Sequence, residues 1–250
     1  MRITLSFSSD KAIILQCNYQ KKLQALIYRY MKKEIADFIH LNGYSADDKS
    51  RKFSLFTFSQ IYSKKKPEYN RRTNSLNFGY EINFTVSTVI EELLVSVIEN
   101  QMRTDGVWLD NNSLSLSGIK VHQAPKFNNP VEIKMLSPMT LYSSENGKYF
   151  YYNPSDIVFS DYIKSNLLNK YAAYTKNGNS NELAFGIKPL FNDFKSKRNK
   201  AIIDYDNFII EAYRGLYEIW GSIELIQFAY DVGLGGKNAQ GLGLWEVYRR

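Results

Sequence analysis

Hydrophobic residues follow two kinds of pattern in the first half of the chain. Apolar and polar side chains alternate over residues 1–8, the period of a strand with one buried face. From about Tyr19 to Phe38, apolar residues recur every three or four positions, which predicts an amphipathic helix that Asn42-Gly43 ends. A second helix is predicted after Thr88, which has capping-box spacing to Glu91. Strands are expected at 53–59, 76–86, 107–109 and 114–121.

A polar, proline-bearing segment at 123–130 separates these elements from a second series. A helix is expected at 157–174, and a final short helix between Ser222, its predicted cap, and Gly233. Strands are expected at 131–135, at 149–152 as half of a hairpin, at 183–187 and within 208–220.

The order strand, helix, strands, helix, strand therefore occurs twice, which is the βαββαβ order of the ferredoxin-like unit. We predict an α+β fold of two tandem ferredoxin-like (RRM-like) domains, residues 1–124 and 125–250, with a C-terminal glycine-rich loop. Two such units side by side would expose two antiparallel sheets and a cleft between them. The halves show no obvious residue-by-residue identity, so the repeat lies in the pattern alone.

Charge and composition restrict the chemistry. The 250 residues carry 32 basic and 25 acidic side chains, a net charge of +7 that favours a polyanionic partner. Cys17 is the one cysteine and there are two histidines, so an internal disulfide is impossible and a Cys/His metal site is nearly excluded. Any chemistry must therefore be metal-free or rest on carboxylates, and we expect no cofactor. No run approaches the roughly 20 apolar residues of a membrane span, and we expect a cytoplasmic location.

The end of the chain contains a glycine-rich segment, residues 233–243, in which five of eleven residues are glycine. Glycine lets a ligand approach backbone N–H groups closely, and Lys237 and Asn238 lie at the tip. The segment is typical of a phosphate cradle, although it matches neither the P-loop nor the dinucleotide-binding pattern. A mobile turn without a ligand is the alternative.

Two segments resemble the CRISPR repeat-processing endoribonucleases, the sixth family of Cas proteins within the RAMP superfamily. One is the glycine-rich segment after a short helix. The other comprises Leu-Ile-Tyr28, Ile-His40 and the run Phe53 to Ser59. The resemblance spans essentially the whole chain, and its tandem ferredoxin-like architecture agrees with the pattern.

The resemblance implies a metal-independent endoribonuclease of antiviral defence that cuts a CRISPR precursor transcript once per repeat and releases guide RNAs. The ribose 2′-OH would attack the adjacent phosphate and leave a 2′,3′-cyclic phosphate and a 5′-OH end. CRISPR repeat RNA, as precursor and processed guide, is the implied partner. Association with other Cas proteins in an effector complex and formation of a homodimer are left open.

Such a cut needs a base, an acid and positive charge near the phosphate. His40 can serve either proton role, because an unperturbed histidine has a pKa near 6.5. Tyr28 matches the helical tyrosine that helps to position or activate the reacting groups in the family. Twelve residues of straight helix would separate the two by about 18 Å, so we expect the helix to break around 32–35. Tyr30 is the alternative, although it lies in the core stripe.

Lys52 is the candidate for the charge-stabilising role, in which the family often uses a lysine shortly before the phenylalanine-rich strand. Two extra residues separate Lys52 from that strand, so Arg51 or Ser54 is left open for this role. We interpret His122, near the predicted domain boundary, as structural or incidental.

RNA binding is expected from basic loops and from the glycine-rich segment. One basic cluster contains Lys64, Lys65, Lys66, Arg71 and Arg72. The RNA-binding residues we predict are Gly233, Gly235, Gly236, Lys237, Asn238, Gly241, Gly243, Lys195, Lys197 and Arg198.

Two other functions compete with the nuclease. The first is a catalytically silent RAMP subunit that binds guide RNA within an effector complex, since a fold alone does not determine activity. The second is an enzyme acting on a small phosphorylated substrate, which a deep closed pocket at the glycine-rich segment would favour.

Overall fold

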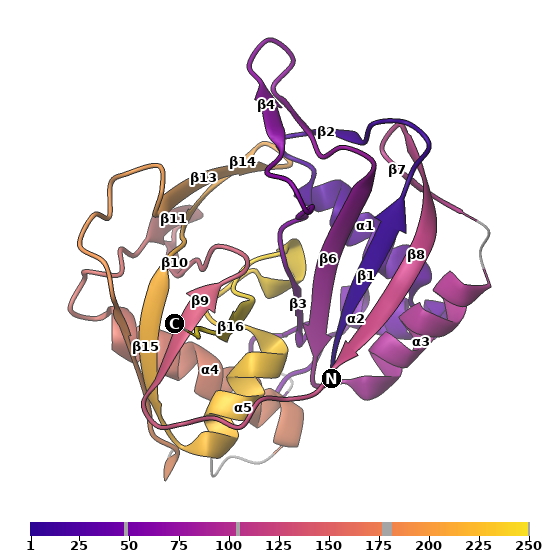
Figure 1. The fold of residues 1–250 in the computed structure, drawn as a ribbon. Helices are drawn as coiled ribbons and strands as arrows, with labels where there is room; N and C mark the ends of the chain where they lie inside the picture. The colour runs from indigo at the N-terminus through magenta and orange to yellow at the C-terminus, as the bar shows by residue number, and fades with distance from the viewer. Residues whose placement is uncertain (48–49, 104–105, 177–181, 250) are drawn as a thin grey trace.

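Two antiparallel sheets, one of five strands and one of four, form the centre of the molecule (Figure 1). The computed structural model describes residues 1–47, 50–103, 106–176 and 182–249. The first sheet has the order β3-β6-β1-β8-β7. Its strands are β1 (Arg2–Ser8), β3 (Phe56–Phe58), β6 (Glu81–Thr88), β7 (Val107–Leu109) and β8 (Asn112–His122). Its helices are α1 (Gln20–Tyr30), α2 (Lys33–Leu41) and α3 (Glu91–Met102).

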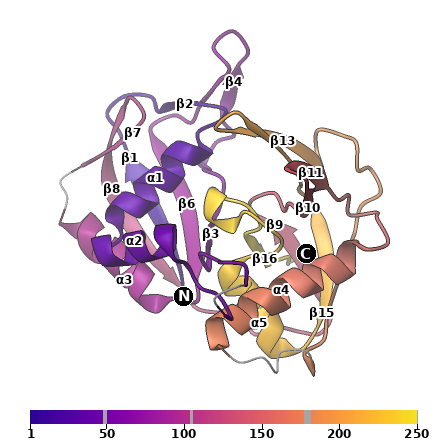
Figure 2. The ribbon, with the colours of Figure 1, turned by 180° about the vertical axis from the view of Figure 1, so that it is seen from behind.

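The second sheet repeats this arrangement with the order β12-β15-β9-β16. Its strands are β9 (Val131–Met135), β12 (Phe185–Pro189), β15 (Leu216–Gly221) and β16 (Trp245–Val247). Its helices, α4 (Phe159–Thr175) and α5 (Ile223–Val232), cover one face of the sheet, as α1 and α3 do in the first unit (Figure 2). In both units the first strand lies between the third and the fourth, which is the ferredoxin-like order. The predicted tandem ferredoxin-like fold is confirmed, whereas a domain boundary between residues 124 and 125 stays a prediction.

Three smaller sheets or hairpins extend these units. The strands β2 (Ile14–Gln16), β4 (Glu68–Asn70) and β5 (Ser75–Asn77) form a three-stranded sheet. Two hairpins belong to the second half, β10 (Tyr142–Glu145) with β11 (Lys148–Tyr151) and β13 (Lys200–Tyr205) with β14 (Phe208–Tyr213). The strand β13 was not predicted, because its residues follow a basic loop and lack a clear boundary signal. No helix in the described ranges is both long and apolar enough to cross a membrane.

Some predicted boundaries differ from the structure. The strand expected at 76–86 is two elements, β5 and β6, because a turn around Gly79, with φ at +77°, separates them. The capping box at Thr88 is wrong, since Thr88 is still in β6 and Glu91 is the first helical residue. The Thr88 hydroxyl instead donates to Leu55 O (2.7 Å) and accepts from Ile90 N (3.0 Å).

Arg2 of β1 connects the two units. Its side chain is buried, its Nη1 donates to Trp245 O at 2.8 Å, and its guanidinium lies 3.4 Å from the Tyr230 ring centroid. Burial lowers the Arg2 pKa to about 10, which leaves the group charged at neutral pH. The buried guanidinium is hydrogen-bonded to a backbone carbonyl of the second unit, so it fixes the position of the two units relative to each other. The pocket described next is formed by residues of both units.

Candidate active site

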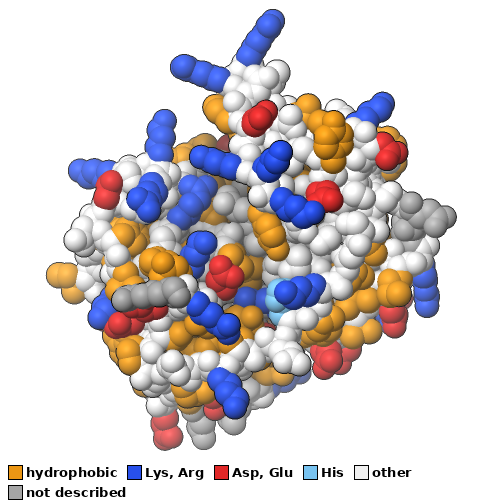
Figure 3. Space-filling view, viewed as in Figure 1, with side chains coloured by type: hydrophobic (Ala, Val, Ile, Leu, Met, Phe, Trp, Pro, Cys, Tyr) orange, Lys and Arg blue, Asp and Glu red, His pale blue; other side chains and the backbone are white. Residues whose placement is uncertain are grey.

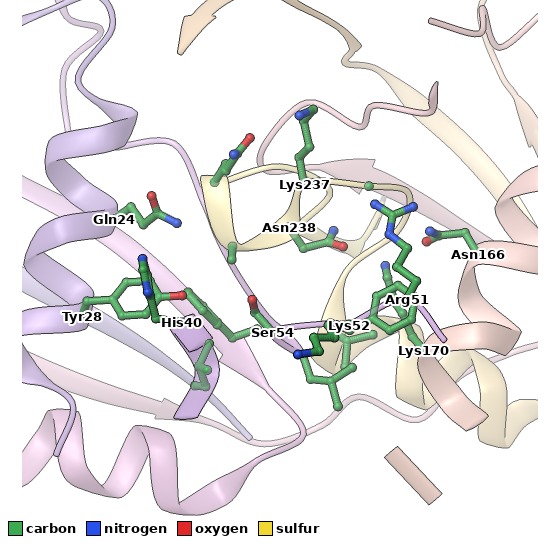
Figure 4. A pocket seen from close by; sticks show the side chains of 18 of the residues that line it. Gln24, Tyr28, His40, Arg51, Lys52, Ser54, Asn166, Lys170, Lys237 and Asn238 are labelled. Atoms are coloured by element: carbon green, nitrogen blue, oxygen red, sulfur yellow. The ribbon is translucent and has the colours of Figure 1, made fainter. Parts of the chain in front are cut away.

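A pocket of about 310 Å³ lies where α1, α2, residues 51–56, α4 and the glycine-rich segment meet (Figure 4). The described residues that line it include five basic side chains and no carboxylate. These basic residues are His40, Arg51, Lys52, Lys170 and Lys237. A cavity with this lining attracts an anion, because no acidic side chain among its described lining residues offsets the positive charge.

A break between α1 and α2 brings Tyr28 and His40 to the same pocket. Met31 and Lys32 adopt ψ angles of 151° and 139°, so α1 stops after Tyr30 and α2 starts in a new direction at Lys33. The break lies at Met31 and Lys32, next to the start of the interval 32–35 in which it was predicted. Figure 4 shows Tyr28 extending from α1 into the pocket, with His40 beside it. The geometric condition for pairing these two residues is met, although their roles stay predictions.

Tyr28 is half-buried and held by packing. Its ring meets Phe56 of β3 edge to face, with centroids 5.7 Å apart. Burial raises the pKa of its hydroxyl, and a hydrogen bond with the Ser54 side chain opposes that shift. At neutral pH the phenol is protonated and can donate a hydrogen bond. His40, in the last turn of α2, is exposed to solvent.

The three candidates for the charge-stabilising role all line the pocket but have different neighbours. Arg51 Nη2 donates to Tyr142 Oη at 2.8 Å, and the guanidinium lies 5.6 Å from the Phe53 ring centroid. Ser54 is a hydrogen-bonding neighbour of the Tyr28 hydroxyl and lowers its pKa. Lys52 is exposed and forms no ion pair with any described residue. Its ammonium is therefore available to a ligand.

The glycine-rich segment is a rigid structure, and most of its N–H groups are occupied. The N–H groups of Gly233, Gly236, Gly241 and Gly243 donate to backbone carbonyls at 2.8–2.9 Å. These four N–H groups are therefore occupied and not free to cradle a phosphate, while RNA binding by the glycine-rich segment stays a prediction. Glycine is required at Gly243 for a different reason, because its φ is +81° and a Cβ there would lie 2.0 Å from Leu234 O.

The tip of the segment presents groups that are free. A short 3₁₀ turn, η2 (Asn238–Gln240), follows Lys237, which has a left-handed φ of 57°. Among the described residues, no acceptor is found for the backbone N–H groups of Lys237, Asn238 and Ala239, all of which line the pocket. The Asn238 side chain braces the loop, since its Nδ2 donates to Leu234 O (3.1 Å) and Leu242 O (3.0 Å).

Lys170 of α4 is a pocket residue that sequence reasoning missed. Its side chain is 3% exposed, and its Nζ donates to Gly233 O (3.0 Å) and Gly235 O (2.7 Å). Burial, with a smaller contribution from Arg51, lowers its pKa well below that of an ordinary lysine. The sequence could have indicated its burial, because Lys170 lies three residues after Leu167 and seven after Ile163, which places it on the buried stripe of the helix.

Comparison with known proteins assigns the chain to a family. Residues 122–247 match the family model described as CRISPR associated protein Cas6, C-terminal. The chain belongs to the Cas6 family. It is 28% identical over 246 residues to the CRISPR-associated endoribonuclease Cas6 of Pyrococcus furiosus, covering 95% of this chain and 85% of that protein. It is 24% identical over 249 residues to the CRISPR-associated endoribonuclease Cas6 1 of Methanocaldococcus jannaschii, covering 98% and 91%.

A solved structure of a Cas6-related protein from Pyrococcus furiosus has the same fold. Its TM-score to this chain is 0.82 at 18% identity, with 100% of this chain and 98% of that chain covered. The Cas6 resemblance inferred from the glycine-rich segment and the N-terminal motifs is confirmed. The match in fold extends over both ferredoxin-like units.

Other predicted residues of this Cas6 chain lie outside the pocket. Lys195, Lys197 and Arg198 are exposed in the connection between β12 and β13. Their RNA contacts stay predictions. His122, at the end of β8, has its Nε2 2.8 Å from Thr4 Oγ1, and burial lowers its pKa.

Basic side chains also surround the hollow between the two sheets, on the face opposite to the helices (Figure 3). That hollow contains a pocket of about 510 Å³ whose lining includes Arg2, Lys134 and Glu246. The positive charge of this Cas6 protein is therefore spread over two faces.

Proposed function

We propose that this Cas6-family endoribonuclease cleaves CRISPR precursor transcripts within each repeat and releases guide RNAs. The observation that carries the proposal is the meeting of Tyr28, His40 and Lys52 in a pocket whose described lining has five basic side chains and no carboxylate. The Pyrococcus furiosus and Methanocaldococcus jannaschii relatives are both named CRISPR-associated endoribonucleases. In this proposal residues 1–124 supply the catalytic side chains and residues 125–250 the glycine-rich segment.

The reaction is an in-line displacement at phosphorus. The 2′-oxygen bonds to the phosphorus as its proton leaves, the bond from phosphorus to the 5′-oxygen breaks, and a proton returns to that oxygen. His40 takes up or delivers one of these protons, because its imidazole exchanges protons near neutral pH. Tyr28, protonated since burial raises its pKa, donates a hydrogen bond that orients the ribose or the phosphate.

Negative charge builds up on the phosphate oxygens as the bond to the 2′-oxygen forms. The Lys52 ammonium stabilises that charge, as do the free N–H groups of Lys237, Asn238 and Ala239. Each of these groups is present before the reaction starts, so little reorganisation is needed in the transition state. Lys170 stabilises the glycine-rich segment, because its Nζ donates to the carbonyls of Gly233 and Gly235.

The decisive experiment is incubation with repeat RNA in EDTA, followed by mapping of the fragment ends. We expect cleavage to continue, with a 2′,3′-cyclic phosphate on one fragment and a 5′-OH on the other. The substitution His40→Ala should slow the cut by at least about 100-fold, the usual contribution of a positioned acid or base, and leave RNA binding nearly unchanged. His122→Ala is the matched control, because it removes the other histidine of the chain.

The outcomes separate the rival functions. Fragments with 5′-phosphate ends, or cleavage that EDTA abolishes, would contradict the mechanism. Tight binding of repeat RNA without any cut by the unchanged protein would instead indicate a silent guide-binding subunit. Light scattering after size-exclusion chromatography, with and without repeat RNA, would show whether a homodimer forms.

A further inference from the structure

The β10–β11 hairpin carries a face made of tyrosines. It is inserted between β9 and α4 and pairs with neither of the two large sheets. The register pairs Tyr142 with Tyr151 and Ser144 with Tyr149, so the three tyrosines share one face of the hairpin. Phe150 points to the opposite face. The ring centroids of Tyr142 and Tyr149 are 5.4 Å apart, and Tyr149 and Tyr151 are stacked with a 23° interplanar angle.

This tyrosine face meets the basic groups of the pocket. Lys237 Nζ lies 4.9 Å from the Tyr142 ring centroid and 5.1 Å from that of Tyr149. The Arg51 guanidinium carbon lies 5.5 Å from the Tyr142 centroid, and Tyr142 also lines the pocket. Tyr149 is 48% exposed, so part of its ring remains available for a further contact. Aromatic surface and positive charge are thus presented together at the rim of the pocket.

No counterion for these two cations is found among the described residues. Neither Arg51 nor Lys237 forms an ion pair with a carboxylate in the part of the chain that the structure describes. Lys237 also holds a left-handed backbone conformation, which is strained for a residue other than glycine. The Lys237 ammonium thus lies over two tyrosine rings at the rim of the pocket, where an anion can reach it.

We propose that the tyrosine face is a subsite for one unpaired nucleotide that flanks the cut phosphate. Its base stacks on Tyr149, and its phosphate lies between Arg51 and Lys237. The proposal rests on the function proposed above, since it gives that site's RNA a specified contact. A nucleotide fits because it joins a flat aromatic base to a phosphate, the two groups that exposed tyrosine rings and adjacent cations bind. Stacking accepts any base, so this subsite would hold the strand without reading its sequence.

The test combines a change in the protein with a change in the RNA. The probe is a labelled repeat RNA in which a 2′-deoxyribose before the cut site blocks cleavage, and abasic nucleotides replace the positions next to the cut one at a time. In the unchanged protein, one abasic position should weaken binding about tenfold, the factor that corresponds to about 1.4 kcal/mol of lost stacking. Tyr149→Ala should weaken binding of the intact RNA by the same factor and have no further effect on that abasic RNA.

Two variants control for damage to the hairpin. Phe150→Ala removes a ring of similar exposure, 51%, from the opposite face and should bind every probe as the unchanged protein does. Tyr149→Phe keeps the ring and should retain full affinity. The abasic series in the unchanged protein does not depend on the folding of any variant.

The proposal is overturned if Tyr149→Ala binds the intact RNA with unchanged affinity, or if its effect simply adds to that of every abasic position. Failure of the proposed function has a different signature. In that case the unchanged protein would not cut unmodified repeat RNA at all, whether or not Tyr149 contributes to binding.

Discussion

His40, Tyr28 and Lys52 illustrate what single residues can do in this pocket. Tyr28 has its ring fixed by Phe56, whereas His40 and Lys52 are exposed. A fixed phenol and two adaptable groups suit a reaction in which one group orients the RNA while the others exchange a proton and balance charge. Single substitutions can therefore separate binding from chemistry.

The third catalytic role can be assigned by comparing Lys52 with Arg51. Lys52→Ala should slow cleavage by about 100-fold and leave RNA affinity within a few-fold, because the ammonium acts on charge that develops in the transition state. Arg51→Ala should instead weaken binding, since its guanidinium is bonded to Tyr142 and faces the tyrosine hairpin. Single-turnover rates and dissociation constants distinguish the two. The reverse pattern would transfer the role to Arg51.

Lys170 makes the stability of the protein depend on pH. Its folded-state pKa is below that of a lysine in the unfolded chain, so the unfolded chain binds the proton more tightly. The free energy of unfolding should therefore gain a contribution as pH rises from the lowered pKa toward about 10.4, the ordinary lysine pKa. Lys170→Met should lose this rise in urea unfolding measured at several pH values. The control is Lys188→Met, on an exposed lysine paired with Glu218 at 2.7 Å. An identical pH profile in both variants would contradict the assignment.

At the scale of elements, the break between α1 and α2 and the bends of the glycine-rich segment bring distant residues together. The break turns a continuous helical stripe into two helices, and the segment closes against β3, where Thr57 Oγ1 donates to Leu242 O at 2.9 Å. Both features depend on backbone conformation. They are therefore best tested by substitutions that change the allowed backbone angles, namely to proline and from glycine to alanine.

Proline can distinguish a break that is already present from one that is introduced. Lys32 has φ at −57°, close to the value that proline imposes, so Lys32→Pro should preserve cleavage. It removes a weak hydrogen bond to Ser96 Oγ at 3.3 Å. Ala36→Pro lies within α2, where its N–H donates to Lys32 O at 3.0 Å, and should displace His40 and abolish cleavage. Circular dichroism and cleavage rates report both effects. Equal loss in the two variants would mean that α1 and α2 act as one helix.

Gly79 and Gly243 have nearly the same φ but different surroundings. Comparing their substitutions distinguishes the cost of a left-handed backbone from the cost of a clash with neighbouring atoms. Gly79→Ala meets no atom within 4 Å and should destabilise the protein by about 1–2 kcal/mol, the cost of a left-handed alanine. Gly243→Ala carries the same cost and also drives a Cβ to 2.0 Å from Leu234 O, so a loss of about 4 kcal/mol or more is expected. Chemical denaturation measures the difference. Equal losses would show that the segment relaxes freely.

Elements with a long hydrophobic repeat could be predicted from the sequence. Features that depend on local backbone angles, such as the helix break and the loop hydrogen bonds, could not be predicted from the repeat. The stripe from Tyr19 to Phe38 indicated helix throughout, and only the requirement that Tyr28 and His40 meet predicted its interruption. The glycines were interpreted as ligand-binding, yet the N–H groups of four of the five bond within the chain, because pattern alone does not tell which groups a loop uses internally. Lys170 was missed since a lysine on a buried stripe looks like a helix-surface residue until its acceptors are known.

For the whole molecule, charge is distributed more widely than the active site requires. Basic side chains occur in the pocket, in the hollow between the sheets and in the loop with Lys195, Lys197 and Arg198. A polyanion that followed such a surface would be held by many weak contacts, each releasing counterions.

The basic side chains of the loop between β12 and β13 should contribute to the salt dependence of RNA binding. Replacing Lys195, Lys197 and Arg198 together by alanine should reduce the slope of log affinity against log salt by up to about 2, at about 0.7 per phosphate contact. A charge-matched control replaces three lysines that are paired with carboxylates, namely Lys21, Lys22 and Lys188. Equal slopes for the two triple variants would mean that net charge alone matters and that the loop makes no RNA contact.

The pocket joins residues that lie far apart in the sequence, and this has a consequence for biosynthesis. Tyr28 and His40 leave the ribosome long before Lys237 and the turn that follows it. Until the glycine-rich segment docks on β3, where Thr57 Oγ1 donates to Leu242 O, a nascent chain lacks the part of the pocket wall that this segment supplies. We therefore expect a chain whose synthesis has not reached this segment to be inert towards transcripts, and a finished chain to be silenced if a protease removes the segment.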